Sequence, residues 1–272
     1  MSKVVHSGIK QSEGYSRYIK QEKSKKRTIA LTQLIILILF IGLWEVAARC
    51  GLINTFLLSS PTAIVRLFTE YLQDGSIFTH IAISVWETVL GFVVGTVLGI
   101  GMAILLWWSP TVAKICDPFL VVLNALPKTA LAPIIIVWAG AGIKGIVVIA
   151  VTISIVTTVL SAYNYFMIVE DEKIQMLKSF GATKKQILYK LILPSNIGNI
   201  LNIIKINIGL SWVGVIVGEF LVSRKGIGYL IVYGGQVFRL DLVMMGVVVL
   251  AVCALVMYQG VNAVEKIYKS KR

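Results

Sequence analysis

The chain has 272 residues, of which 57% are apolar and 14% are charged, and its mean hydropathy is +0.85. This balance excludes an ordinary water-soluble domain, in which about a quarter of the residues are charged. The formal net charge of +13 is typical of a membrane protein that contacts anionic lipid headgroups, so we expect membrane lipid and no nucleic acid as a partner.

Six apolar stretches are long enough to cross a bilayer, since a transmembrane helix needs about 20 mostly apolar residues. They are residues 28–48, 78–108, 118–140, 145–169, 197–222 and 242–264. We expect one all-α integral membrane domain of six transmembrane helices, with no room for a soluble catalytic domain. Its predicted parts are a basic cytoplasmic tail at 1–27, a first transmembrane helix at 28–49, an outer interfacial helix at 58–75, a core of five transmembrane helices at 76–265 and a tail at 266–272.

The distribution of Lys and Arg predicts which loops face the cytoplasm. If the N-terminus is inside, the cytoplasmic segments hold 18 of the 26 Lys and Arg residues and the outer segments hold six, while Lys128 and Lys205 lie within the spans. Cytoplasmic loops carry the excess of positive charge. We therefore expect a multi-pass cell-membrane protein with both termini in the cytoplasm.

The start of the chain resembles a signal peptide, because a basic stretch precedes an apolar run. However, both are longer than in a signal peptide and five further spans follow, so we expect an uncleaved first helix. Ser60-Pro61 then favours a helix start, with Ser as N-cap and Pro at the first helical position. The apolar and charged residues that follow lie on opposite faces, which indicates a helix on the outer membrane surface.

Glycines four residues apart predict close helix packing within the membrane. One helix face of the second span carries Gly91, Gly95 and Gly99, and the fifth span carries Gly214 and Gly218.

Polar and aromatic residues inside the spans are candidates for a solute pathway. Lys128 is expected near the middle of the third span, between Pro127 and Pro133, where a buried charge costs about 2.5–3.5 kcal/mol. It fits either an anion-attracting pathway residue or a structural partner of Glu87 or Glu219. The candidate pathway residues are Asn124, Lys128, Trp138, Trp212 and Glu219. Lys205 shares a helix face with Glu219, so pathway lining and interhelical pairing are both possible for these two.

The polar segment at 170–196 is predicted to form two short helices. Acidic residues at 170–172 suit the N-terminus of the first helix, and Gly181 ends it. Thr183 and Gln186 fit a capping box at the start of the second helix, which Pro194 is expected to stop. A plain connector is shorter. The segment fits either a surface gripped by a partner or a helical hairpin packed on the membrane face.

The segment resembles the cytoplasmic "EAA" loop of ABC importer permeases, because nine residues separate Gly181 from Leu191 and one more separates Leu191 from Leu193-Pro194. Further motifs are similar to the nitrate/sulfonate/taurine branch of that family. They are 126–133, 138–142, 211–214, Glu219, 226–231 and 241–243, and together the resemblance covers roughly residues 58–262.

The resemblance implies a type I ABC importer permease whose 170–196 loop carries a coupling helix that docks on cytoplasmic ATPase subunits. The implied docking residues are Leu177, Phe180, Gly181, Ala182, Leu193 and Pro194. The family's Glu-Ala-Ala falls on residues 175–177, where Gln175 replaces the acidic residue, so the docking role transfers without a carboxylate contact.

Other implied partners are an extracytoplasmic substrate-binding protein and a second permease subunit, with a homodimer expected for this branch. The solute would be a small anion such as nitrate, a sulfonate or taurine, imported by alternating access. Relatives in the family also carry vitamin precursors, so the solute stays open. ATP would be bound by the partner, so this chain is expected to hold no cofactor.

The sequence does not predict an enzyme. It has two histidines and three widely spaced cysteines, without a catalytic Ser/His/Asp set, metal-ligand spacing or a Gly-rich phosphate loop. We therefore expect no catalytic residues and no metal site. The alternative to an ABC permease is a channel or ion-coupled carrier that needs no ATPase.

Overall fold

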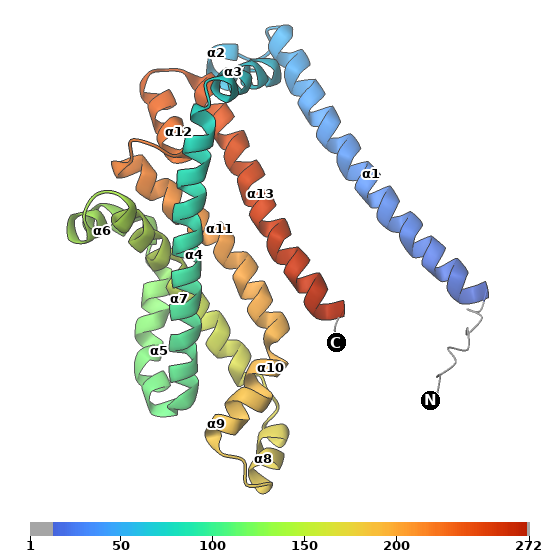
Figure 1. Ribbon diagram of the computed structural model, residues 1–272, viewed down its shortest axis with the longest axis vertical. Helices are drawn as coiled ribbons and strands as arrows, with labels where there is room; N and C mark the ends of the chain where they lie inside the picture. The colour runs from blue at the N-terminus through green and yellow to red at the C-terminus, as the bar shows by residue number, and fades with distance from the viewer. Residues whose placement is uncertain (1–12, 271–272) are drawn as a thin grey trace, which may run out of the picture. The chain divides into compact units, whose positions relative to one another are not determined.

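The computed structural model describes residues 13–270, and all regular elements within that range are helices (Figure 1). The chain divides into two units, residues 1–63 and 64–272, and each is described by itself. The first unit contains α1 (Glu13–Arg49), α2 (Thr55–Leu58) and the start of α3 (Pro61–Gln73).

The predicted helix start at Ser60-Pro61 is present, because α3 begins at Pro61 and the Ser60 hydroxyl accepts from the Ala63 amide at 3.2 Å. Within the same unit, the Glu45 carboxylate accepts from Arg49 Nε at 2.7 Å and from the Thr62 amide at 3.1 Å. These bonds tie the last turns of α1 to the first turn of α3. The place of α3 at a membrane surface stays a prediction.

The second unit consists of the rest of α3 and a bundle of long helices with shorter elements at its two ends. The elements are α4 (Ser76–Trp108), α5 (Pro110–Ala125), η1 (Lys128–Leu131), α6 (Ala132–Ala139), α7 (Ile143–Met167), α8 (Asp171–Ser179), α9 (Lys184–Ile187), η2 (Leu188–Ile192), α10 (Leu193–Ser195), α11 (Ile197–Val222), α12 (Ile227–Gln236) and α13 (Leu240–Ser270). In Figure 1, α8 and α9 lie at the lower end of this unit and α12 lies at its upper end.

Five helices in the described range are long and apolar enough to cross a membrane: residues Arg27–Arg49, Ser76–Trp108, Ile143–Met167, Ile197–Val222 and Leu240–Ile267. A sixth span is possible only if the helices Pro110–Ala125 and Lys128–Ala139 count as one, and these bend by 87° at their junction. The expected continuous helix over 118–140 is therefore wrong. Pro127 lacks an N–H and disfavours helical geometry at Leu126, which is extended at φ −64° and ψ 138°.

The predicted close packing at glycines is confirmed, and it joins α4, α7 and α11. A Cβ added at Gly91 would lie 2.6 Å from the Cβ of Ala150, and one at Gly99 would lie 2.6 Å from the Cβ of Thr158. On α11, a Cβ at Gly214 would overlap the main chain of the same Ala150. Since lipid offers no hydrophobic drive for helix association, such backbone proximity is what holds membrane helices together.

A buried polar cluster links the same three helices. The Asn207 side-chain amide on α11 donates to Thr96 Oγ1 on α4 at 2.9 Å and to Thr158 Oγ1 on α7 at 2.8 Å. All three side chains are buried. Interhelical hydrogen bonds of this kind contribute about 0.6–2 kcal/mol each in membranes. The helices α4, α7 and α11 thus form one packed body, which we call the three-helix body.

Candidate functional site: the 170–196 segment and the Lys128 break

The 170–196 segment forms the two predicted helices around a left-handed corner. The first is α8, and Gly181 follows it at φ +79°, a conformation that glycine adopts without strain. The capping box is confirmed, because the Thr183 amide donates to Gln186 Oε1 at 2.8 Å and the Gln186 amide donates to Thr183 Oγ1 at 3.3 Å. The corner is therefore fixed by backbone geometry on both sides.

The segment rests on a buried apolar base at one end of the bundle. Ile187, Leu188 and Ile192 are buried together with Phe166 of α7 and Ile203 of α11. Partly buried side chains pack against this cluster, and they include Ile174, Leu177, Ala182, Leu191 and Leu193. Burying an aliphatic side chain contributes about 1.5–3 kcal/mol, so the segment is anchored on the ends of α7 and α11.

The tip of the corner is open to solvent. Phe180 is 80% exposed, and a side chain at Gly181 would meet nothing within 4 Å. Of the six predicted docking residues, these two lie at the tip. Leu177, Ala182 and Leu193 contribute to the base instead, and Pro194 lies in α10. An exposed aromatic ring beside a glycine on a packed base is suited to contact another protein.

The expectation that Pro194 stops the second helix is wrong. The chain continues through the π-helix η2 into α10 and reaches α11 after a single turn residue, Asn196. At the end of η2 the Leu193 amide donates to the Leu188 oxygen, five residues back. The wider π turn accommodates the proline, which cannot donate a hydrogen bond and whose ring crowds the preceding turn. The segment is thus joined to α11 almost without a hinge.

The break between α5 and α6 brings two predicted pathway residues together. Lys128 Nζ donates to Asn124 Oδ1 at 3.3 Å and to the Asn124 main-chain oxygen at 3.5 Å. Thr157 Oγ1 of α7 donates to the same Asn124 Oδ1 at 3.5 Å. Lys128 therefore does not lie in mid-helix, and the expected pairing with Glu87 or Glu219 is wrong because its partner is Asn124. Its half-buried ammonium group stands at a kink, where irregular backbone is tolerated only beside protein or a water-filled space.

The two predicted tryptophans lie in different environments. Trp138 on α6 is 82% exposed and borders a hollow of about 370 Å³ that is lined from η1, α6 and α7. Trp212 on α11 is 4% exposed. Trp138 is therefore free to line a pathway or to anchor the helix in lipid, whereas Trp212 packs inside this chain.

Glu219 is a buried anchor for the start of α12. It is 1% exposed, and its carboxylate accepts from Ser84 Oγ at 2.5 Å and from the amides of Gly228 at 2.5 Å and Tyr229 at 3.4 Å. An anionic group suits a helix N-terminus because of the free amides and the helix dipole. Glu219 is thus not on an exposed surface of this chain.

Lys205 of α11 forms an ion pair with Glu265 of α13. Of the two roles open for Lys205 in the sequence, the structure shows interhelical pairing.

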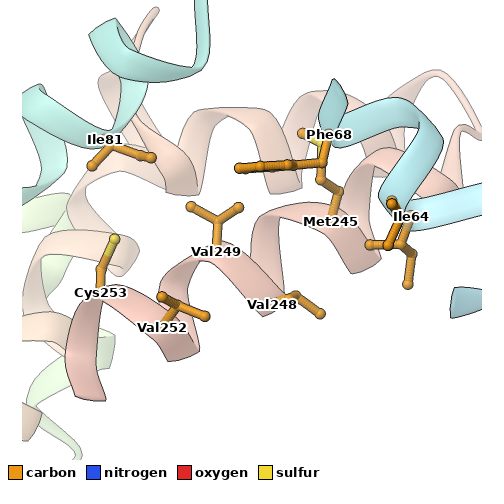
Figure 2. Close-up of a pocket in the computed structure, with 9 residues that line it drawn as sticks. Ile64, Phe68, Ile81, Met245, Val248, Val249, Val252 and Cys253 are labelled. Carbon is orange, nitrogen blue, oxygen red and sulfur yellow. The ribbon is translucent and has the colours of Figure 1, made fainter. Parts of the chain in front are cut away.

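Another hollow, of about 270 Å³, lies between α3, α4 and α13 (Figure 2). Its lining is apolar and includes Phe68, Ile81, Met245 and Val249. It offers a polar solute no cation and no donor stronger than the Cys253 thiol, because the other side chains that line it are aliphatic, aromatic or thioether groups. The Asn124–Lys128 break is therefore the better candidate for contact with an anion.

Comparison with known proteins decides the family. Residues 95–269 match the family model described as the binding-protein-dependent transport system inner membrane component. The chain belongs to this family. It is therefore an ABC importer permease, a transport protein and not an enzyme, as the sequence predicted. A permease of this kind works with ATP-hydrolysing subunits and a substrate-binding protein.

Relatives of this permease come from several transport systems. It is 27% identical to SsuC of Bacillus subtilis, named for aliphatic sulfonates transport, over 86% of this chain and 85% of SsuC. It is 25% identical to the taurine transport system permease protein TauC of Escherichia coli, over 89% of each chain. It is 30% identical to the formylaminopyrimidine transport permease protein ThiX of Halalkalibacterium halodurans, over 75% of this chain and 81% of ThiX.

A solved structure supports the fold of the permease. Its helices superpose on a chain of the inward-facing MetNI methionine ABC transporter with a TM-score of 0.55, at 15% identity, over 72% of this chain and 97% of that chain. At this identity the likeness establishes the fold alone. The predicted fold class, an all-α type I permease, is confirmed.

Proposed function

We propose that this permease imports a small solute by alternating access, and that cytoplasmic ATPase subunits drive it by gripping the corner at Phe180 and Gly181. The observation that carries the proposal is the exposed Phe180 ring on a base that is packed against α7 and α11. A partner that moves this corner moves the ends of two spanning helices. The 170–196 segment is called the coupling segment from here on.

The docking surface consists of a tip and a base. Phe180 and Gly181 form the tip that enters the partner, and Leu177, Ala182, Leu193 and Pro194 hold the tip in place. Gln175 is exposed on α8, so it offers the partner an amide where the family has a carboxylate. Docking through this surface therefore relies on apolar contact at Phe180 and not on an ion pair at Gln175.

For the solute we propose a small anion such as nitrate, a sulfonate or taurine. The names of SsuC and TauC support this class, while ThiX is named for formylaminopyrimidine transport. The half-buried cation of Lys128, held beside Asn124, supports an anion. In this proposal Asn124, Lys128 and Trp138 border the pathway, and the buried Trp212 and Glu219 shape the wall behind it.

The remaining parts of the assembly follow from the same proposal. Two copies of the permease surround the pathway, both termini and the coupling segment face the cytoplasm, and the substrate-binding protein delivers the solute at the opposite face. ATP binds to the partner subunits, so this chain holds no cofactor. The Lys and Arg distribution supports this orientation.

Variants of Gly181 test the docking. Gly181→Trp and Gly181→Ala share the backbone strain of a positive φ, but only the tryptophan adds bulk at the corner. Nothing of this chain lies within 4 Å of the added Cβ, so the indole starts from open space and we expect it to clash with a partner. We expect Gly181→Trp to reduce the amount of ATPase subunit that copurifies in mild detergent at least tenfold. The amount with Gly181→Ala should stay near that of the wild type.

Equal copurification of both variants at normal membrane levels would contradict docking at this corner. An absence of any ATPase subunit from the wild-type preparation would favour the channel or ion-coupled carrier.

A further inference from the structure

Lys184, the first residue of α9, contacts a helix to which the coupling segment is not joined in sequence. Its Nζ donates to the main-chain oxygen of Trp108 at 2.5 Å and lies 5.7 Å from the ring centroids of Trp107 and Trp108. Trp108 is the last residue of α4, so its carbonyl has no partner within the helix. A cation there also complements the negative end of the helix dipole. Lys184 therefore caps α4.

Both ends of the Lys184 side chain are held in place. Its main chain follows Thr183, whose capping box fixes the start of α9. Its ammonium group is held by the Trp108 carbonyl, and Trp107 packs against the buried base of the coupling segment. The same side chain borders a hollow of about 190 Å³ together with Ile174, Ala182 and Ile187. This contact, which we call the bridge, thus joins the capped start of α9 to the last turn of α4 at the protein surface.

The bridge adds a polar contact to the apolar packing between α4 and the coupling segment. The coupling segment continues directly into α7 on one side and α11 on the other. The third member of the three-helix body, α4, is linked to these helices by glycine packing and by the Thr96–Asn207 hydrogen bond. Ala103 and Trp107 of α4 pack against the apolar base of the segment, and Lys184 adds a hydrogen bond from the segment to the C-terminal end of α4.

We propose that Lys184 is a positioning residue of the transport cycle, which holds the C-terminal end of α4 to the coupling segment so that the three-helix body follows the segment as one unit. This inference rests on the proposed function, since it describes how motion started by ATPase docking reaches α4. The neighbouring Lys185 is a matched control. It is exposed, and its side chain has no hydrogen bond or ion pair within the described part of the chain.

A distance measurement tests the bridge. Spin labels would replace Leu105 on α4 and Tyr189 on η2, which are 65% and 60% exposed, after Cys50, Cys116 and Cys253 are replaced by serine. The permease–ATPase complex in lipid nanodiscs is measured by pulsed electron paramagnetic resonance, without nucleotide and with ATP and vanadate. Wild type and Lys185→Met should give one narrow, nucleotide-independent distribution.

Lys184→Met should broaden the distribution at least twofold in both states, because a thioether neither donates to the carbonyl nor carries a charge. Lys184→Arg should restore the narrow distribution, since a guanidinium group donates hydrogen bonds and stacks on tryptophan. An unchanged distribution in Lys184→Met, or equal broadening in Lys185→Met, would overturn the bridge. Loss of ATPase subunits from the wild-type complex would contradict the docking proposal alone, since the nucleotide-free distributions still decide the bridge.

Discussion

In the sequence, Glu219 is a charged residue within a membrane span. In the structure, it holds the turn that leads into α12. Its carboxylate accepts from Ser84 on α4 and from two amides at the start of α12. Glu87 on α4 is also a buried carboxyl group, at 1% exposure. Neither carboxyl group forms an ion pair with a Lys or Arg within the described part of the chain.

Removing the Glu219 acceptor should destabilise the permease more than neutralising it. Glu219→Ala leaves the Gly228 and Tyr229 amides buried without their acceptor, at about 1–3 kcal/mol for each unsatisfied group. Glu219→Gln keeps one acceptor oxygen. We expect the thermal unfolding midpoint of the detergent-solubilised protein to fall markedly for alanine and by less than half as much for glutamine. Equal midpoints for the two variants would contradict the anchoring role.

Individual side-chain roles were only partly predictable from the sequence. Lys128, Glu87 and Glu219 are recognisable in the sequence as unusual charges, but their partners are not. The partner of Lys128 depends on a helix break that Pro127 permits without specifying, and Glu219 binds the start of α12. The bridge at Lys184 could not be distinguished from Lys185, because both are lysines in the first turn of one helix. Only the direction of each side chain separates them.

At the scale of elements, local signals predicted the helices well where backbone chemistry determines the outcome. The capping box at Thr183 and Gln186 and the turn at Gly181 are present as predicted. Proline gave the two errors. Pro127 broke a helix that was expected to continue, and Pro194 was absorbed by a π turn in a helix that was expected to stop. Proline excludes ordinary α-geometry, but tertiary packing decides between a kink and a π turn.

Two glycines of α11 provide a matched test of helix packing. A Cβ at Gly214 overlaps Ala150 of α7, whereas one at Gly209 meets nothing within 4 Å. We expect Gly214→Leu to cost about 1–3 kcal/mol through overpacking and to lower the thermal midpoint and the yield of folded protein. Gly209→Leu should be neutral, since leucine favours helix and projects away from the body. Similar losses in both variants would indicate a general intolerance of α11.

At the scale of the molecule, the second unit is a three-helix body with a structured segment at one end and α12 at the other (Figure 1). Composition and span lengths predicted the membrane class, and the motifs predicted the family. What they could not supply is which docking residues reach the surface. The same spacing of apolar residues can serve burial or recognition, so the sequence does not separate the two. In the structure Leu177 and Leu193 pack against the apolar base, and Phe180 carries the exposed aromatic ring at the tip.

The most direct measurement of the central claim is photo-crosslinking from the tip of the coupling segment. A cysteine-free permease carrying Phe180→Cys, or Tyr233→Cys on α12 as the control, would be labelled with a benzophenone maleimide in membranes that contain the ATPase subunits. We predict a permease–ATPase product from position 180 and none from position 233. A product from position 233, or none from position 180, would contradict docking at the coupling segment.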